Sequence, residues 1–203
     1  MTRESPVLMT PIVLEMRPSA RNVLAICAAA VTLSGILVPA ATETYEQANI
    51  DANGQLRIVT ATGKVIRPKR LPARPNIGDQ VGFDKVAISP DRRVVGWLAL
   101  YPNCCTSYPI PLALVLYSNG KTRTFKGNEL PVWRWRFEAD GKQVAFEQET
   151  VHGGIGVHYE LRDALTGRLV EEYDPPSPQG PNAHPGPNQT GAPGWVTRLD
   201  SSN

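Results

Sequence analysis

Two stretches of the chain share one pattern, and this internal repeat constrains the fold more than any other feature. The first is VAISPDRRVVGWLAL, residues 86–100, and the second is WRFEADGKQVAFEQE, residues 135–149. Each is an apolar run, a turn centred on an aspartate and a second apolar run. The two alignments, of Asp91 with Asp140 and of Trp97 with Phe146, both have a spacing of about 49 residues. Two apolar runs joined by a short polar turn predict a β-hairpin.

A second hairpin pattern follows each of these stretches. LALVLYSNGKTRTF (112–125) has the turn signal Asn119-Gly120, and VHYELRDALTGRLVEEY (157–173) has Thr166-Gly167. The sequence therefore predicts four strands in each unit. They are 81–89, 94–100, 112–117 and 121–126 in the first, and 132–137, 142–151, 157–163 and 168–173 in the second. Upstream, GQLRIVTATGKVIRP (54–68) matches only the last two strands of a unit.

ISPDRRVVGW and FEADGKQVAF resemble the SPDG-x-x-IAF signature of the TolB-like β-propeller repeat, and YELRDALTGRLVEEY resembles the third and fourth strands of that repeat. The resemblance covers residues 54–173 and implies an all-β fold of antiparallel four-stranded, blade-like units. Arg92 replaces the turn glycine of the signature. Two and a half units are fewer than a closed propeller has, so we expect an incomplete propeller or an open twisted stack of sheets. Exposed sheet edges would favour a homo-oligomer.

The two ends of the chain differ from this repeat domain in composition. Residues 1–40 predict a signal peptide, in which an apolar helix over 23–38 precedes cleavage near Ala40. We therefore expect a periplasmic or extracellular protein; the alternative is a membrane anchor through 23–38. Residues 41–53 are expected to be a linker. Residues 174–203 form a Pro/Gly-rich tail that we expect to be disordered, with a docking strand at 195–199.

The resemblance also predicts where loops of interest lie, because the connection between the second and third strands emerges on the same face of every blade. Here these connections are YPNCCTSYPIP (101–111) and VHGGIGVH (151–158). The candidates for a binding face are Tyr101, Cys104, Cys105, Tyr108, His152 and His158. Export favours a disulfide between Cys104 and Cys105, with free thiols and a bridge between chains as alternatives. The net charge of +2 argues against a nucleic-acid partner.

Cysteine and histidine together also allow chemistry. A histidine that lowers the pKa of Cys105 would make it a nucleophile, and both cysteines with both histidines would form a zinc ligand set. Adjacent cysteines are poorly spaced for one zinc ion, and no catalytic motif surrounds them. The leading hypothesis is an exported, non-enzymatic interaction module that binds a protein or cell-envelope partner and needs no cofactor. The alternative is a small periplasmic thiol- or metal-dependent hydrolase.

Two polar patterns complete the predictions. In WRWRF (133–137), the aromatic residues would lie on one face of a strand, in the core, and the arginines on the other, in solvent. An exposed aromatic platform for a carbohydrate or peptide is the alternative. Glu147, Glu149 and Glu160 alternate with apolar residues, which predicts a solvated sheet face.

Overall fold

The computed structural model describes residues 42–104, 107–126, 130–152, 156–176 and 191–201. All of them belong to one compact unit that begins at Ala40. The predicted signal segment, 1–40, lies outside the described residues. Within the described ranges, no helix is long and apolar enough to cross a membrane.

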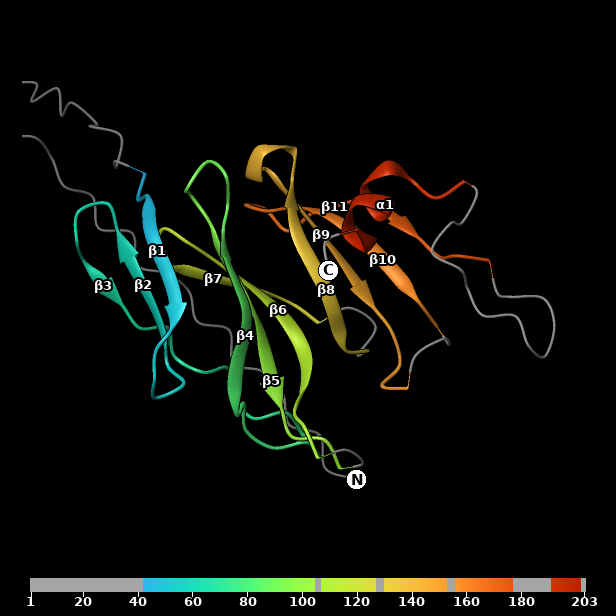
Figure 1. Cartoon of the computed structure of the whole chain (residues 1–203), viewed down its shortest axis with the longest axis horizontal. Coiled ribbons are helices and arrows are strands. Elements are labelled where there is room, and N and C mark those ends of the chain that lie inside the picture. Colours follow the sequence, from blue (N-terminus) through green and yellow to red (C-terminus); the bar gives the residue numbers. More distant parts are fainter. Residues whose placement is uncertain (1–41, 105–106, 127–129, 153–155, 177–190, 202–203) are drawn as a thin grey trace, which may run out of the picture. The chain divides into compact units, whose positions relative to one another are not determined.

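The described part of the chain is mostly antiparallel β-structure in three sheets, none of which closes on itself (Figure 1). The small sheet contains β1 (Tyr45–Ile50), β2 (Leu56–Thr60) and β3 (Val65–Ile66). The central sheet contains β4 (Gly82–Ile88), β5 (Val95–Tyr101), β6 (Ile110–Ser118) and β7 (Lys121–Phe125). The C-terminal sheet contains β8 (Val132–Glu138), β9 (Gln143–Gln148), β10 (His158–Asp163) and β11 (Leu169–Tyr173). Two four-stranded antiparallel units after a shorter one were predicted, and their strands are confirmed.

The tight turns follow from their residues. Asn119 and Gly120, between β6 and β7, have φ of 50° and 76°, as a two-residue hairpin turn that matches the twist of its strands requires. Arg92 has φ of 59° at the position where the repeat signature has glycine. The Ser89 hydroxyl supports that turn: it donates to Asp91 Oδ1 (2.6 Å) and accepts from the Val94 N–H (2.9 Å). A side-chain network therefore holds a backbone conformation that glycine would adopt at less cost.

The predicted linker, 41–53, is wrong in part, because β1 lies within it and pairs with β2. Tyr45 is the only buried residue of β1, so the strand has no apolar alternation by which the sequence could reveal it. Tyr45 is fully buried, and its hydroxyl accepts a hydrogen bond from the Asn119 N–H at 3.0 Å. One tyrosine thus ties the small sheet to the β6–β7 turn.

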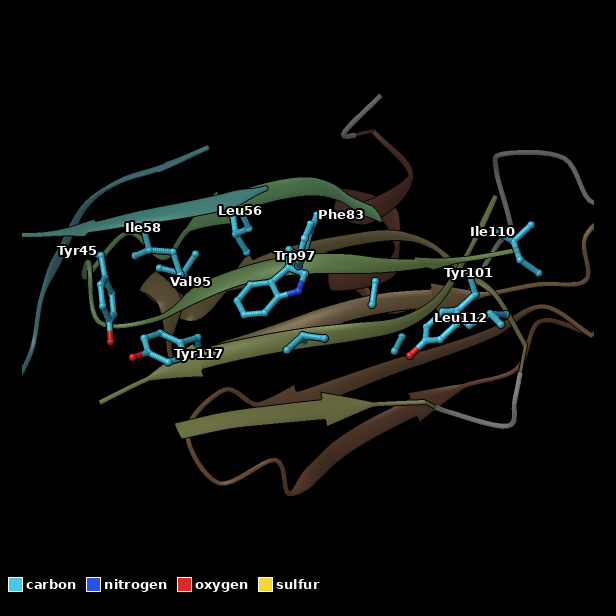
Figure 2. Packing of buried hydrophobic residues seen from close by; sticks show 13 residues of the cluster. Tyr45, Leu56, Ile58, Phe83, Val95, Trp97, Tyr101, Ile110, Leu112 and Tyr117 are labelled. Atoms are coloured by element: carbon cyan, nitrogen blue, oxygen red, sulfur yellow. The ribbon is translucent and has the colours of Figure 1, made fainter. Parts of the chain in front are cut away.

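The central sheet is buried on both faces. One face carries Val95, Trp97, Ala99 and Tyr101 of β5, which share a core cluster with residues of the small sheet (Figure 2). The other face packs against the C-terminal sheet, in a cluster that contains Leu98, Leu114, Leu116, Trp135, Val144 and Phe146. Because successive strand residues point to opposite faces, almost every residue of β5 and β6 is in one core or the other.

The far face of the C-terminal sheet is covered by the helix α1 (Gly194–Asp200). Trp195, Val196 and Leu199 are buried there in one cluster with Ala145, Tyr159 and Leu161. Docking of the C-terminal residues is as predicted, but the predicted strand at 195–199 is wrong. The three apolar residues lie at positions i, i+1 and i+4, which share one face of a helix. The Pro/Gly-rich residues 177–190 lie outside the described ranges.

The WRWRF segment lies within β8, and Trp135 and Phe137 lie on the face opposite Arg134 and Arg136, as predicted. Trp133 does not share their face: it lies at a register irregularity between Val132 and Arg134 and packs against the other core cluster, which contains Trp97. Trp135 is only 9% exposed and Phe137 packs with it in the same cluster, so the two tryptophans do not form an exposed platform. The arginines differ from the prediction because they meet carboxylates instead of open solvent. Arg134 contacts Glu147 and lies 3.1 Å from Asp200 of α1, and Arg136 lies 3.0 Å from Glu138.

The predicted solvated face with Glu147 and Glu160 is wrong. Glu147 is 1% exposed and Glu160 is 5% exposed. Both faces of the C-terminal sheet are covered, one by the central sheet and the other by α1, so its polar positions face other side chains. Each buried carboxylate accordingly contacts a basic partner, Arg134 for Glu147 and Arg162 for Glu160.

The interface between the central and C-terminal sheets predicts a strict requirement at Gly96. A Cβ atom there would lie 2.4 Å from the ring of Trp135. We expect Gly96→Ala to lower the free energy of unfolding by about 2 kcal/mol, measured by urea denaturation. Gly82→Ala is the matched control, because its Cβ would meet Leu100 at an ordinary 3.4 Å. Equal midpoints for the two variants would contradict this packing.

The docking of α1 gives a second prediction. Leu199 is fully buried and Thr197, in the same helix, is exposed. Leu199→Ala should therefore lower the unfolding free energy by about 2 kcal/mol, and Thr197→Ala by less than about 0.5 kcal/mol. If both variants unfold at the wild-type urea concentration, α1 does not contribute to the core.

Candidate functional site

The first predicted loop begins where β5 ends. Tyr101 is its last strand residue and is buried, with its hydroxyl donating to the Pro72 carbonyl at 3.5 Å. Tyr108 is 51% exposed. Cys104 is disulfide-bonded, and Cys105 lies outside the described residues, so their pairing stays a prediction.

The second predicted loop joins β9 to β10. Val151 packs against the core cluster that contains Tyr101 and Ile110, so residues of both predicted loops contribute to one cluster. His152 is exposed, whereas His158 is buried at the start of β10. His158 contacts the carboxylates of Asp174 and Glu160. Because Cys105 lies outside the described residues, the arrangement of the six candidates on one binding face stays a prediction. No group of three metal-ligating side chains suited to an ion occurs in the described ranges.

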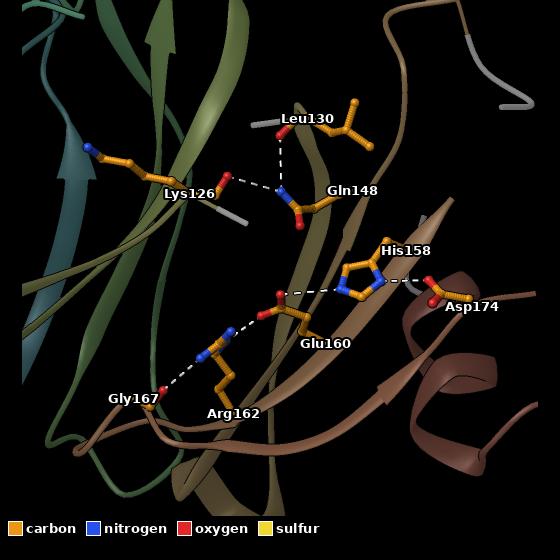
Figure 3. A network of polar contacts seen from close by, with 8 residues as sticks. All are labelled: Lys126, Leu130, Gln148, His158, Glu160, Arg162, Gly167 and Asp174. Carbon is orange, nitrogen blue, oxygen red and sulfur yellow. Dashed lines mark hydrogen bonds and ion pairs between the residues drawn. The ribbon is translucent and has the colours of Figure 1, made fainter. Parts of the chain in front are cut away.

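A row of polar side chains lies along one face of β10 (Figure 3). His158 Nδ1 is 2.6 Å from Asp174 Oδ1, and Nε2 is 3.3 Å from Glu160 Oε1. Glu160 also contacts Arg162, whose Nη1 donates to the Gly167 carbonyl at 3.0 Å. The row connects the start of β10 to the β10–β11 turn. The sequence gives the alternation of these residues but not their burial.

The two carboxylates determine the charge of His158. Burial lowers its pKa, but hydrogen bonds and charge interactions with Asp174 and Glu160 outweigh burial and raise the pKa above the usual value. A histidine whose nitrogens both contact carboxylates has neither of them free to take a proton from a thiol. The row is therefore a structural ion-pair network.

The described residues also contain a pocket, which Tyr101 helps to line. Its volume is about 390 Å³, and it is lined by residues 71–75 and by Tyr101, Thr124 and Lys126. We call it the basic pocket. It lies where β5 and β7 end, beside the predicted loop 101–111. Of the six predicted residues, Tyr101 alone lines it.

One wall of the basic pocket is held by buried polar groups. The buried Gln80 side chain accepts from the Leu71 N–H at 2.7 Å and donates to the Gly82 carbonyl at 2.7 Å. Arg74 Nη1 donates to the Leu112 carbonyl at 3.2 Å, and its guanidinium lies 5.8 Å from the centre of the Tyr101 ring. The segment 71–75 is thereby fixed against the central sheet.

Lys126 also lines the basic pocket. Its carbonyl accepts from Gln148 Nε2 at 3.2 Å, and the same amide donates to the Leu130 carbonyl at 3.1 Å. Figure 3 shows the Lys126 side chain extending away from Gln148. Gln148 of β9 thus fixes the backbone of Lys126.

The basic pocket has a one-sided charge. Among the lining residues that the structure describes, Arg74 and Lys126 are charged and none is acidic. Burial raises the pKa of Tyr101, which Arg74 partly opposes, so the tyrosine is neutral at physiological pH. The lining therefore combines two cations, two hydroxyl groups and the apolar surface of 71–75. The sequence analysis missed LPARP (71–75); its two prolines around an arginine, just before the first full unit, were the available signal.

The chain was compared with known proteins by sequence. No protein-family model matches it, and no curated protein matches it either. The TolB-like repeat thus remains a resemblance of three short segments, and the function of the site follows from its own residues.

The network around His158 predicts a pH-dependent contribution to stability. Because the folded-state pKa is raised, the stabilisation is complete below about pH 6.5 and is lost as the pH rises through the folded-state value. Asp174→Asn should therefore lower the midpoint of the His158 imidazole signal in an NMR titration. It should also cost up to about 1 kcal/mol below pH 6.5 and less at high pH.

His158→Gln assigns the imidazole signal, and Asp79→Asn, which removes an exposed loop carboxylate, is the control. A His158 midpoint below about 6.5 in the wild-type protein would contradict the network.

Proposed function

We propose that the chain is an exported, non-enzymatic interaction module that binds a protein or cell-envelope partner. Its binding surface, which we call the loop end, consists of segment 71–75 and of the residues at the C-terminal ends of β5, β7 and β9. Loops on a rigid sheet scaffold are the usual place for binding residues. The basic pocket is the observation that carries this proposal, because it is a preformed hollow at that end.

The size and construction of the pocket support binding. A volume of about 390 Å³ lies in the range of small ligand sites and suits one or two side chains of a partner. Hydrogen bonds of Gln80 and Arg74 fix segment 71–75, and a hydrogen bond from Gln148 fixes the backbone of Lys126. A site that is already ordered loses little conformational entropy when it binds.

The described chemistry offers less support for a hydrolase. Cys104 is disulfide-bonded, and both ring nitrogens of His158 contact carboxylates. A thiol hydrolase based on Cys105 would need another base, and the exposed His152 is the other histidine among the described residues. No observation places that histidine beside a thiol.

Site-specific photo-crosslinking in the native cells tests the proposal. A benzophenone amino acid replaces Ala73, which lines the basic pocket, or Leu165, which is 50% exposed in the β10–β11 turn. We expect a covalent adduct in the envelope fraction from position 73 and none above background from position 165. Equal adducts from both positions, or none from position 73, would contradict binding through the loop end.

A further inference from the structure

We infer that the basic pocket recognises a carboxylate on an extended, partly apolar peptide segment of the partner. This inference rests on the proposed interaction function and adds the chemical class of the group that the pocket holds. It follows from the charge, the construction and the apolar part of the lining, taken in turn.

Lys126 provides the main attraction for an anion. Its side chain is exposed at the pocket and forms no ion pair within the part of the chain that the structure describes. Its ammonium group carries three N–H donors with which it can bind an anion. By contrast, Lys64 at the small sheet is 3.4 Å from Glu43. A cation beside a hollow whose described lining has no acidic residue favours a negatively charged group.

Arg74 adds a second positive charge that cannot easily move. Its guanidinium is held between the Tyr101 ring and the Leu112 carbonyl, an arrangement in which one N–H group is used. Guanidinium N–H groups that remain can donate to a carboxylate oxygen. Because the group is already positioned, little rotamer entropy is lost when an anion arrives. Arg74 and Lys126 thus both act on a ligand in one hollow.

The rest of the lining decides between kinds of anion. Leu71, Pro72, Ala73 and Pro75 form an apolar wall next to the cations. A free phosphate or a nucleic-acid backbone would leave that wall uncovered, and the overall charge of +2 is too small to attract a polyanion. An acidic side chain flanked by apolar residues would satisfy both parts of the pocket. We therefore assign the ligand as a peptide carboxylate.

The test is an NMR titration of the ¹⁵N-labelled protein with the acetylated, amidated peptide Leu-Pro-Glu-Pro-Leu. We expect shifts of the Ala73, Thr124 and Lys126 amide signals that saturate with a dissociation constant of about 1 mM, as for a short flexible ligand. The same peptide with glutamine in place of glutamate should bind about five- to tenfold more weakly.

Variants separate a specific contact from general electrostatic attraction. Lys126→Gln should weaken binding of the glutamate peptide about five- to tenfold and leave the glutamine peptide unchanged. Lys121→Gln is the matched control, because Lys121 is an exposed lysine at the other end of the same strand and does not line the basic pocket. Its effect on binding should be less than twofold, about the level of a distant screened charge.

Three results would overturn the inference. They are equal binding of the two peptides, equal effects of the two lysine variants, and saturation of the same amide shifts by inorganic phosphate but not by the glutamate peptide. Crosslinking from Ala73 separates this failure from that of the proposed function. An adduct of undiminished yield in Lys126→Gln cells keeps the interaction function and overturns the carboxylate, whereas the lack of any wild-type adduct removes the function itself.

Discussion

Burial of the central sheet on both faces is the constraint on which the rest of the structure depends. The strands β5 and β6 send alternate side chains into two different cores, one shared with the small sheet and one with the C-terminal sheet. At the second interface the Trp135 ring lies so close to the Gly96 backbone that there is no room for a methyl group. The Trp135 side chain of the C-terminal sheet therefore packs directly against the backbone of the central sheet. Each sheet thus supports the next.

The basic pocket is a direct continuation of the first core. Tyr101 is the last member of the β5 row that includes Val95 and Trp97, and it places its ring where the core ends. That ring supports Arg74, and its hydroxyl contacts the Pro72 carbonyl. The position of the residues that line the pocket is thus set by the register of β5, several residues away in the interior.

The sequence predicted the strands well because their patterns are local. Apolar alternation and turn residues such as Asn119-Gly120 act over a few residues, and a repeat displays each of them twice. It failed where a residue's surroundings come from distant parts of the chain. Nothing near Glu147 or Glu160 reveals that α1 or the central sheet covers them, and β1 has only Tyr45 to mark it. The basic pocket was missed for the same reason, since Arg74 and Lys126 are adjacent only in space.

The helix α1 restricts where a further repeat unit could be added to the sheets. The central sheet packs against the C-terminal sheet through one of its faces. On the C-terminal sheet, α1 covers the face that corresponds to that one. Seven residues therefore do the work of a terminal cap, as polar outer repeats do in solenoid proteins. Any longer homologue that adds a unit after β11 would have to give up this helix or carry it to the new end. In this chain, the face on which a further sheet would pack is thus occupied by α1.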